Sequence, residues 1–190
     1  MDPQASLTLS ALAALVLTAV VCDLRSRRIP NALVASGMLL GLLIQTVAPL
    51  GGGLFSQPAG ALGFGPALLG GLAGLGLFLP LYAMRGMGAG DVKLLAMVGV
   101  WLGAHSVLYV ALWTMVAGGV LALATALWTG VLRQVLANIR VMLLNSMVRA
   151  QLGIGYGLEP PARATGRLPY AVAIACGAAF EVARLQVLAP

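Results

Sequence analysis

Six runs of apolar residues, most of them long enough to cross a lipid bilayer, limit most strongly what this chain can fold into. A membrane-spanning helix needs about 20 mainly apolar residues. Only 8% of the 190 residues are charged, which is too little for the surface of a soluble domain. The sequence therefore predicts an all-α integral membrane protein, with residues 1–190 forming a single domain. We predict spans at about Leu7 to Val21, Ala32 to Pro49, Pro66 to Met84, Asp91 to Leu102, Ser106 to Thr129 and Pro169 to Leu188.

Small residues within these runs are expected at close helix contacts, because a missing side chain lets two backbones approach. The glycines concerned are Gly70, Gly71, Gly74, Gly118 and Gly119. The first run has no basic segment before it and no convincing cleavage site after it. We therefore expect a retained helix there and not a signal peptide.

Basic residues predict the orientation of the spans. Ten of the eleven Lys and Arg residues lie in or beside the loops after the first, third and fifth spans, and only Arg184 falls near the other side. Basic loops stay in the cytoplasm, so these three loops are expected there and both termini outside. The net charge of +6 then reflects topology and anionic lipid headgroups, and lipids are expected partners. The sequence contains no nucleic-acid-binding motif.

The stretch from about 131 to 167 differs from the spans. Its first part, about 131–150, places apolar residues at helical spacing, with Arg133, Arg140 and Arg149 mostly off that stripe. This pattern is typical of an amphipathic helix on the cytoplasmic leaflet, although the segment also fits an extension of the fifth span. A Gly/Pro-rich connector is expected after it. The apolar stripe consists of Leu132, Val135, Leu136, Ile139, Leu143 and Met147.

Two of the five acids stand out by their position. One acid lies at the N-terminus, one lies in the connector, and Glu181 has Arg184 at i,i+3 as a partner. Asp23 ends the first span and Asp91 begins the fourth, so both are expected at the cytoplasmic end of the membrane. Carboxylates within spans are costly, by about 2.5 to 3.5 kcal/mol on insertion scales, and usually serve a function.

Each acid also has a structural interpretation. Asp91 suits the N-terminus of its helix as a cap, and Asp23 has Arg25 and Arg27 nearby as ion-pair partners. Two acids at matching depth favour a catalytic dyad, in which one carboxylate acts as a base and the other holds a proton. Such a pair activates water for attack on a peptide carbonyl.

The residues around the two acids fit this interpretation. Gly88 and Gly90 are expected to permit backbone angles closed to other residues and to leave space beside Asp91. No metal-binding or nucleophile motif is visible, so no metal or cofactor is expected. Cys22 and Cys176 lie in apolar stretches and are expected to be small buried hydrophobes, and the single His105 is expected to be structural.

Three segments resemble one protein family. The residues GAGDVKLL at 88–95 resemble the GxGD signature of the type IV prepilin peptidases. The residues DLRSRRIPN at 23–31 resemble the segment around the first catalytic aspartate of that family. The residues LPYAVAIA at 168–175 are similar to the proline-tyrosine opening of its last helix. A bare GxGD motif is also found in presenilin-type proteases, but three segments in the family's order are a more specific match.

The resemblance implies a six-helix aspartic protease of the bacterial inner membrane that cleaves the basic leaders of prepilins or pseudopilins on the cytoplasmic side. It implies Asp23 and Asp91 as the catalytic pair and the pilus assembly machinery as a further partner. Lys93, two residues after Asp91, is a candidate substrate contact, unless it reaches lipid phosphates instead. The sequence has no CxxC motif, so methyl transfer is not expected. It resembles the small peptidase-only branch found with Tad/Flp pili.

Two alternatives stay open at the level of the sequence. A presenilin-like intramembrane protease is the nearest enzyme, but its tyrosine-aspartate motif is absent because Cys22 precedes Asp23. A non-enzymatic small transporter or pilus-assembly scaffold is the other, with the two acids as a proton or cation site.

Overall fold

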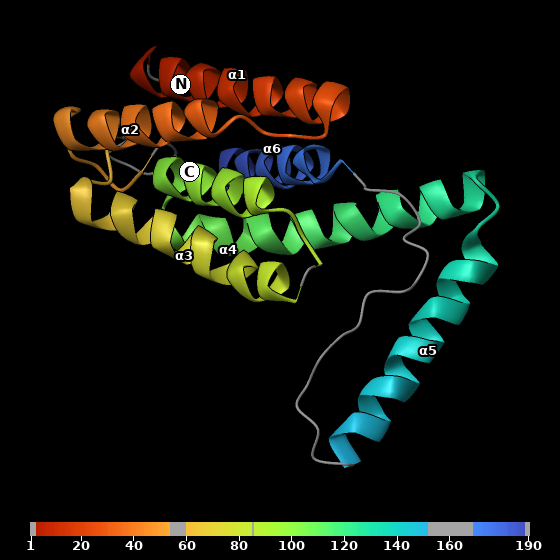
Figure 1. Cartoon of the computed structure of the whole chain (residues 1–190). Coiled ribbons are helices and arrows are strands. Elements are labelled where there is room, and N and C mark those ends of the chain that lie inside the picture. The colour runs from red at the N-terminus through yellow and green to blue at the C-terminus, as the bar shows by residue number, and fades with distance from the viewer. Residues whose placement is uncertain (1–2, 54–59, 85, 152–168, 189–190) are drawn as a thin grey trace.

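The computed structural model describes residues 3–53, 60–84, 86–151 and 169–188, and over these residues it forms helices and no strand. Four helices are long and apolar enough to cross a membrane, namely α1, α3, α4 and α6, and α2 is a shorter apolar helix. This confirms the predicted all-α membrane fold (Figure 1). The helices are α1 (Pro3–Ser26), α2 (Asn31–Val47), α3 (Phe64–Ala83), α4 (Ala89–Trp128), α5 (Leu132–Gln151) and α6 (Tyr170–Leu188).

Helix α4 contains the fourth and fifth predicted spans, which meet at a bend. Gly103 has φ 85° and ψ 170°, which interrupts the helix and requires a residue without a Cβ. A Cβ on Gly99 would lie 3.2 Å from Cγ2 of Val107, whereas eight residues of straight helix rise about 12 Å. The chain therefore folds back at Gly103 into a first arm (89–102) and a second arm (104–128), as Figure 1 shows.

The open backbone at this bend is satisfied by a buried glutamine. Gln45, in α2, is only 3% exposed. Its Nε2 donates to the carbonyl oxygen of Trp101 at 2.8 Å, and its Oε1 accepts the N–H of Leu62 at 2.9 Å. The Trp101 ring nitrogen in turn donates to the carbonyl of Gly37 at 2.9 Å. A buried carbonyl without a partner costs several kcal/mol, so the bond from Gln45 to Trp101 stabilises the helix end at the bend.

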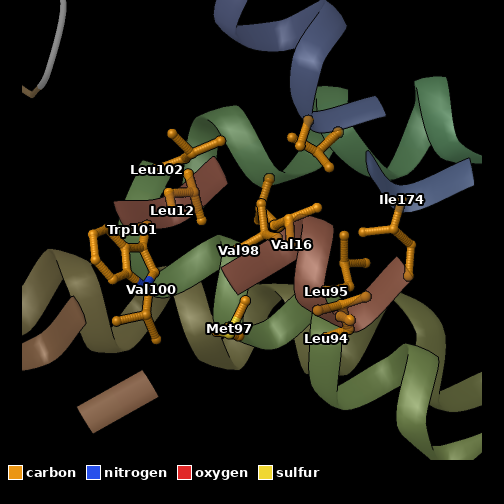
Figure 2. Packing of buried hydrophobic residues seen from close by; sticks show 14 of the residues in the cluster. Leu12, Val16, Leu94, Leu95, Met97, Val98, Val100, Trp101, Leu102 and Ile174 are labelled. Carbon is orange, nitrogen blue, oxygen red and sulfur yellow. The ribbon is translucent and has the colours of Figure 1, made fainter. Parts of the chain in front are cut away.

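The first arm of α4 forms the centre of the bundle. Every residue from 94 to 102 is buried, as expected for a helix that is apolar on all sides. Figure 2 shows this packing: Leu12 and Val16 of α1 and Ile174 of α6 lie with the first arm in one cluster. The helix that carries Asp91 is therefore held on several sides.

Close contact between α3 and the first arm depends on glycine. Gly70 packs directly against the carbonyl oxygen of Gly99, and a Cβ on Gly74 would lie 2.7 Å from the carbonyl oxygen of Leu95. The predicted contact role is confirmed for these two glycines, for Gly71 and for Gly118. It is wrong for Gly119, where a Cβ would meet nothing within 4 Å.

Helix α5 is separate from α4. A turn at Thr129 and Gly130, whose φ is 70°, ends α4, and α5 begins at Leu132 and leads away from the bundle (Figure 1). The alternative that α5 extends the fifth span is therefore wrong. Its placement on a lipid leaflet stays a prediction. The structure does not describe residues 152–168, so the connector predicted up to residue 167 lies outside the described residues.

Candidate active site

Asp23 and Asp91 lie at the same end of the bundle. Asp23 is in the last turn of α1 and Asp91 is in the first turn of α4. Figure 1 shows that α1 and α3 finish at this end, and that α2, α4 and α6 begin there. The structure thus gathers the two acids that are 68 residues apart in the sequence.

The segment after α1 lies against the start of α4. A Cβ on Gly90 would lie 3.2 Å from Cβ of Ile29. The Lys93 ammonium donates to Oδ1 of Asn31, the first residue of α2, at 3.1 Å. These two contacts fix the turn between α1 and α2 over the helix that carries Asp91.

Asp91 is half-buried and acts as a cap of its own helix. Its Oδ2 accepts the N–H of Gly88 at 3.2 Å, a bond from the third helical residue back to the N-cap position. The prediction that Asp91 caps its own helix is therefore correct. A cap bond uses one carboxylate oxygen and one of its lone pairs, so it leaves the carboxyl group able to exchange protons.

The two motif glycines support the site by size and not by conformation. Gly88 has φ −79° and ψ 149°, which any residue adopts, and neither Gly88 nor Gly90 is among the described glycines with positive φ. The expectation of unusual backbone angles is wrong. The expectation of space is correct, since a Cβ on Gly88 would lie 3.0 Å from Oδ2 of Asp91 and one on Gly90 would press on Ile29.

Asp23 is buried, with 7% of its surface exposed, and is bonded to α6. Its Oδ2 accepts the main-chain N–H of Ala171 at 3.2 Å. Among the described residues it forms no ion pair, so the expected pairing with Arg25 or Arg27 is not found. Sequence reasoning noted the opening of the last helix at Pro169 but did not connect it with Asp23.

The two carboxyl groups are close enough to interact electrostatically. Like charges that share a site favour a state in which one carboxyl keeps its proton, and this is the arrangement that general acid–base catalysis by two acids requires. The geometry is thus suited to hydrolysis with water as the nucleophile.

Glu181 and His105 are not part of this site. Glu181 pairs with Arg184 through two bonds of 2.6 Å, as predicted for this i,i+3 pair. His105 is exposed and its ring contacts Tyr109. Among the described residues, no three His, Cys, Asp or Glu side chains gather in the manner of metal ligands. Both described cysteines are free thiols, with Cys22 half-buried and Cys176 exposed, although both were expected to be buried.

Comparison with known proteins identifies a family. The model of the type IV leader peptidase family matches residues 10–123, a range that includes both acids and the helices from α1 into the second arm of α4. No curated protein and no solved structure matches the chain.

Proposed function

The chain belongs to the type IV leader peptidase family, and on that premise we propose that it is a membrane-embedded aspartic endopeptidase. Its substrates would be prepilins or pseudopilins, from which it removes the leader peptide. The sequence of 190 residues contains no CxxC motif, so we limit the proposal to peptide-bond cleavage and favour the peptidase-only branch found with Tad/Flp pili.

The observation that carries the proposal is the meeting of Asp23 and Asp91 at one end of the bundle. In the proposed reaction, one carboxylate removes a proton from a water molecule while the water oxygen attacks the scissile carbonyl carbon. The other carboxyl group, which is protonated, gives its proton to the carbonyl oxygen. Breakdown of the tetrahedral intermediate cleaves the C–N bond. The leaving nitrogen takes the proton held by the first carboxyl group, and a hydroxyl of the intermediate returns its proton to the second carboxylate, which restores both groups. No metal or cofactor takes part in this scheme.

The proposed site faces the cytoplasm of a bacterial cell, at the inner membrane. Exposed Arg25, Arg28 and Lys93 lie at the end of the bundle that holds both acids, which supports this orientation through the positive-inside rule. Cleavage on that side would produce mature pilins for the pilus assembly machinery, which we propose as a further partner.

Helix α5 is proposed to lie on the same leaflet. It follows Trp128, which is 94% exposed at the end of the second arm, as an aromatic residue at a membrane interface would be. On α5 itself, Leu136 and Ile139 are exposed, and so are Arg133 and Arg140. The apolar residues suit acyl chains and the arginines suit anionic headgroups.

Lys93 is proposed as a contact for an acidic residue of the substrate. It lies two residues after Asp91, its side chain is exposed, and its bond to Asn31 at 3.1 Å holds it at the proposed site. An ammonium group in this position would favour a substrate that carries a carboxylate just beyond the cleavage point.

Co-expression with the prepilin encoded nearest to the gene tests the proposal. We expect a faster-migrating product in membranes that contain the wild-type protein and none with an empty vector, and N-terminal sequencing of the product should give one cleavage point. An unprocessed prepilin beside normally inserted protein would instead favour a transporter or scaffold.

A further inference from the structure

Asp23 depends on a donor from a distant part of the chain. The N–H of Ala171 donates to its Oδ2 at 3.2 Å, and Ala171 is the second residue of α6. The first N–H groups of a helix have no acceptor within the helix, so this bond costs α6 nothing. The N-terminus of a helix also carries a partial positive charge, which suits a carboxylate.

The position of α6 is set by the second arm of α4. At the middle of α6, a Cβ on Gly177 would lie 2.6 Å from the carbonyl oxygen of Val110 and 2.9 Å from the N of Thr114, so the two backbones are in contact. Near its start, a Cβ on Gly118 would lie 3.3 Å from the Tyr170 ring.

Further contacts hold the other end of α6. The rings of Phe180 and Trp113 are in contact, with centroids 4.0 Å apart and a tilt of 35° between the ring planes. The guanidinium of Arg184, held by Glu181, lies 4.1 Å from the centre of the Tyr109 ring. Because contacts occur from Tyr170 to Arg184, α6 has little freedom to slide along α4.

We propose that the main-chain amide of Ala171 is a positioning group for Asp23, and that the packing of α6 against α4 sets its place. By occupying Oδ2, the amide fixes the rotation of the carboxyl group and leaves Oδ1 as the oxygen available to water. The inference rests on the proposed function of Asp23. It adds that α6 takes part in the reaction by holding the Asp23 carboxyl group.

Replacement of one N–H tests this directly. Ala171→Pro removes the donor, and proline is tolerated in the first turn of a helix. Val172→Pro is the matched control, because it removes the neighbouring N–H, which bonds to the carbonyl of Pro169 at 3.1 Å. We expect Ala171→Pro to lower kcat on purified prepilin about ten- to hundredfold with KM within about twofold, as for loss of a hydrogen bond to a charged group. Val172→Pro should stay within about threefold of wild type. Equal kcat values for the two variants would overturn the inference.

Because Ala171 is fully buried, a proline there also risks misfolding. Gly177→Ala then decides: its Cβ presses on rigid backbone and pushes α6 away, whereas Gly119→Ala in the facing helix enters open space. We expect Gly177→Ala to lower kcat, without a matching change in KM, and Gly119→Ala to leave both unchanged. A wild-type kcat in Gly177→Ala overturns the inference.

A double-mutant cycle on thermal stability separates this inference from the proposed function. If the amide acts through Asp23, the destabilisation by Ala171→Pro should shrink in an Asp23→Ala background, whatever the protein catalyses. Additive effects would overturn the inference alone. Coupling in a protein whose Asp23→Asn variant still cleaves prepilin would support the bond and refute the catalytic role of Asp23.

Discussion

The contact between α3 and the first arm of α4 allows a matched test of the packing, with two glycines two residues apart in α3. Gly74 faces α4, where a Cβ would lie 2.7 Å from the carbonyl oxygen of Leu95 and 3.0 Å from Cα of Ala96. Gly76 faces outward, and a Cβ there would meet nothing within 4 Å. Alanine at the two sites therefore adds the same methyl group to opposite environments.

The expected effects have opposite signs. Ordinary van der Waals contact begins at 3.4 Å, so Gly74→Ala needs α3 and α4 to separate by about 0.7 Å, and the groups in the way are backbone. Overpacking of this kind typically costs about 1–3 kcal/mol. Gly76→Ala relieves the entropic cost of a glycine within a helix, a gain of about 0.5–1 kcal/mol.

Thermal unfolding in detergent micelles measures both variants. A protein of this size shifts its Tm by about 2–4 °C per kcal/mol. We therefore expect Gly74→Ala to lower the Tm by about 2–12 °C and Gly76→Ala to raise it by about 1–4 °C. If Gly74→Ala is as stable as Gly76→Ala, then α3 and α4 do not pack as closely as described. In that case α3 does not hold the helix that carries Asp91 in place.

Three further predictions concern chemistry, substrate and topology. Replacement of Cys22, Cys176 or His105 by alanine should keep the rate of prepilin cleavage within a few fold of wild type, because the proposed reaction uses no thiol or imidazole. Loss of activity at normal protein levels would contradict this. Lys93→Glu should slow processing of the native prepilin, since it replaces an attraction for a substrate carboxylate by repulsion, and an unchanged rate in a gel-shift time course would exclude Lys93 from docking. Reporter fusions after Arg28 should register the cytoplasm and fusions in the 51–60 loop the outside, and the reverse pattern would refute the orientation.

Much of the fold was predictable because the bilayer imposes a simple rule on the sequence. The apolar runs predicted the helices that the structure contains, and the short break at residues 103–105 separated the two arms of α4. The sequence did not reveal how the backbone at that break is satisfied. Gln45 was a usable signal, since an uncharged polar residue deep in an apolar run needs a buried partner.

The candidate site was predictable only in its side chains. Asp23 and Asp91 stood out because carboxylates are costly in a membrane. The Ala171 amide has no sequence signal, because every residue but proline carries an N–H and only the packing of α6 places this one beside Asp23. The reason for the glycine at 88 was also wrong, since sequence alone does not distinguish a glycine needed for space from one needed for positive φ.

The rate of prepilin cleavage by purified Asp23→Asn, Asp91→Asn and doubly substituted protein tests the central claim most directly. Asparagine nearly matches aspartate in shape but cannot exchange a proton in this reaction, so each single variant should insert normally and lose most of its activity. The double variant should lose little more, because the two carboxyl groups act as a unit. If either single variant, free of deamidation, still cleaves at a tenth of the wild-type rate or faster, that aspartate is not part of a catalytic pair.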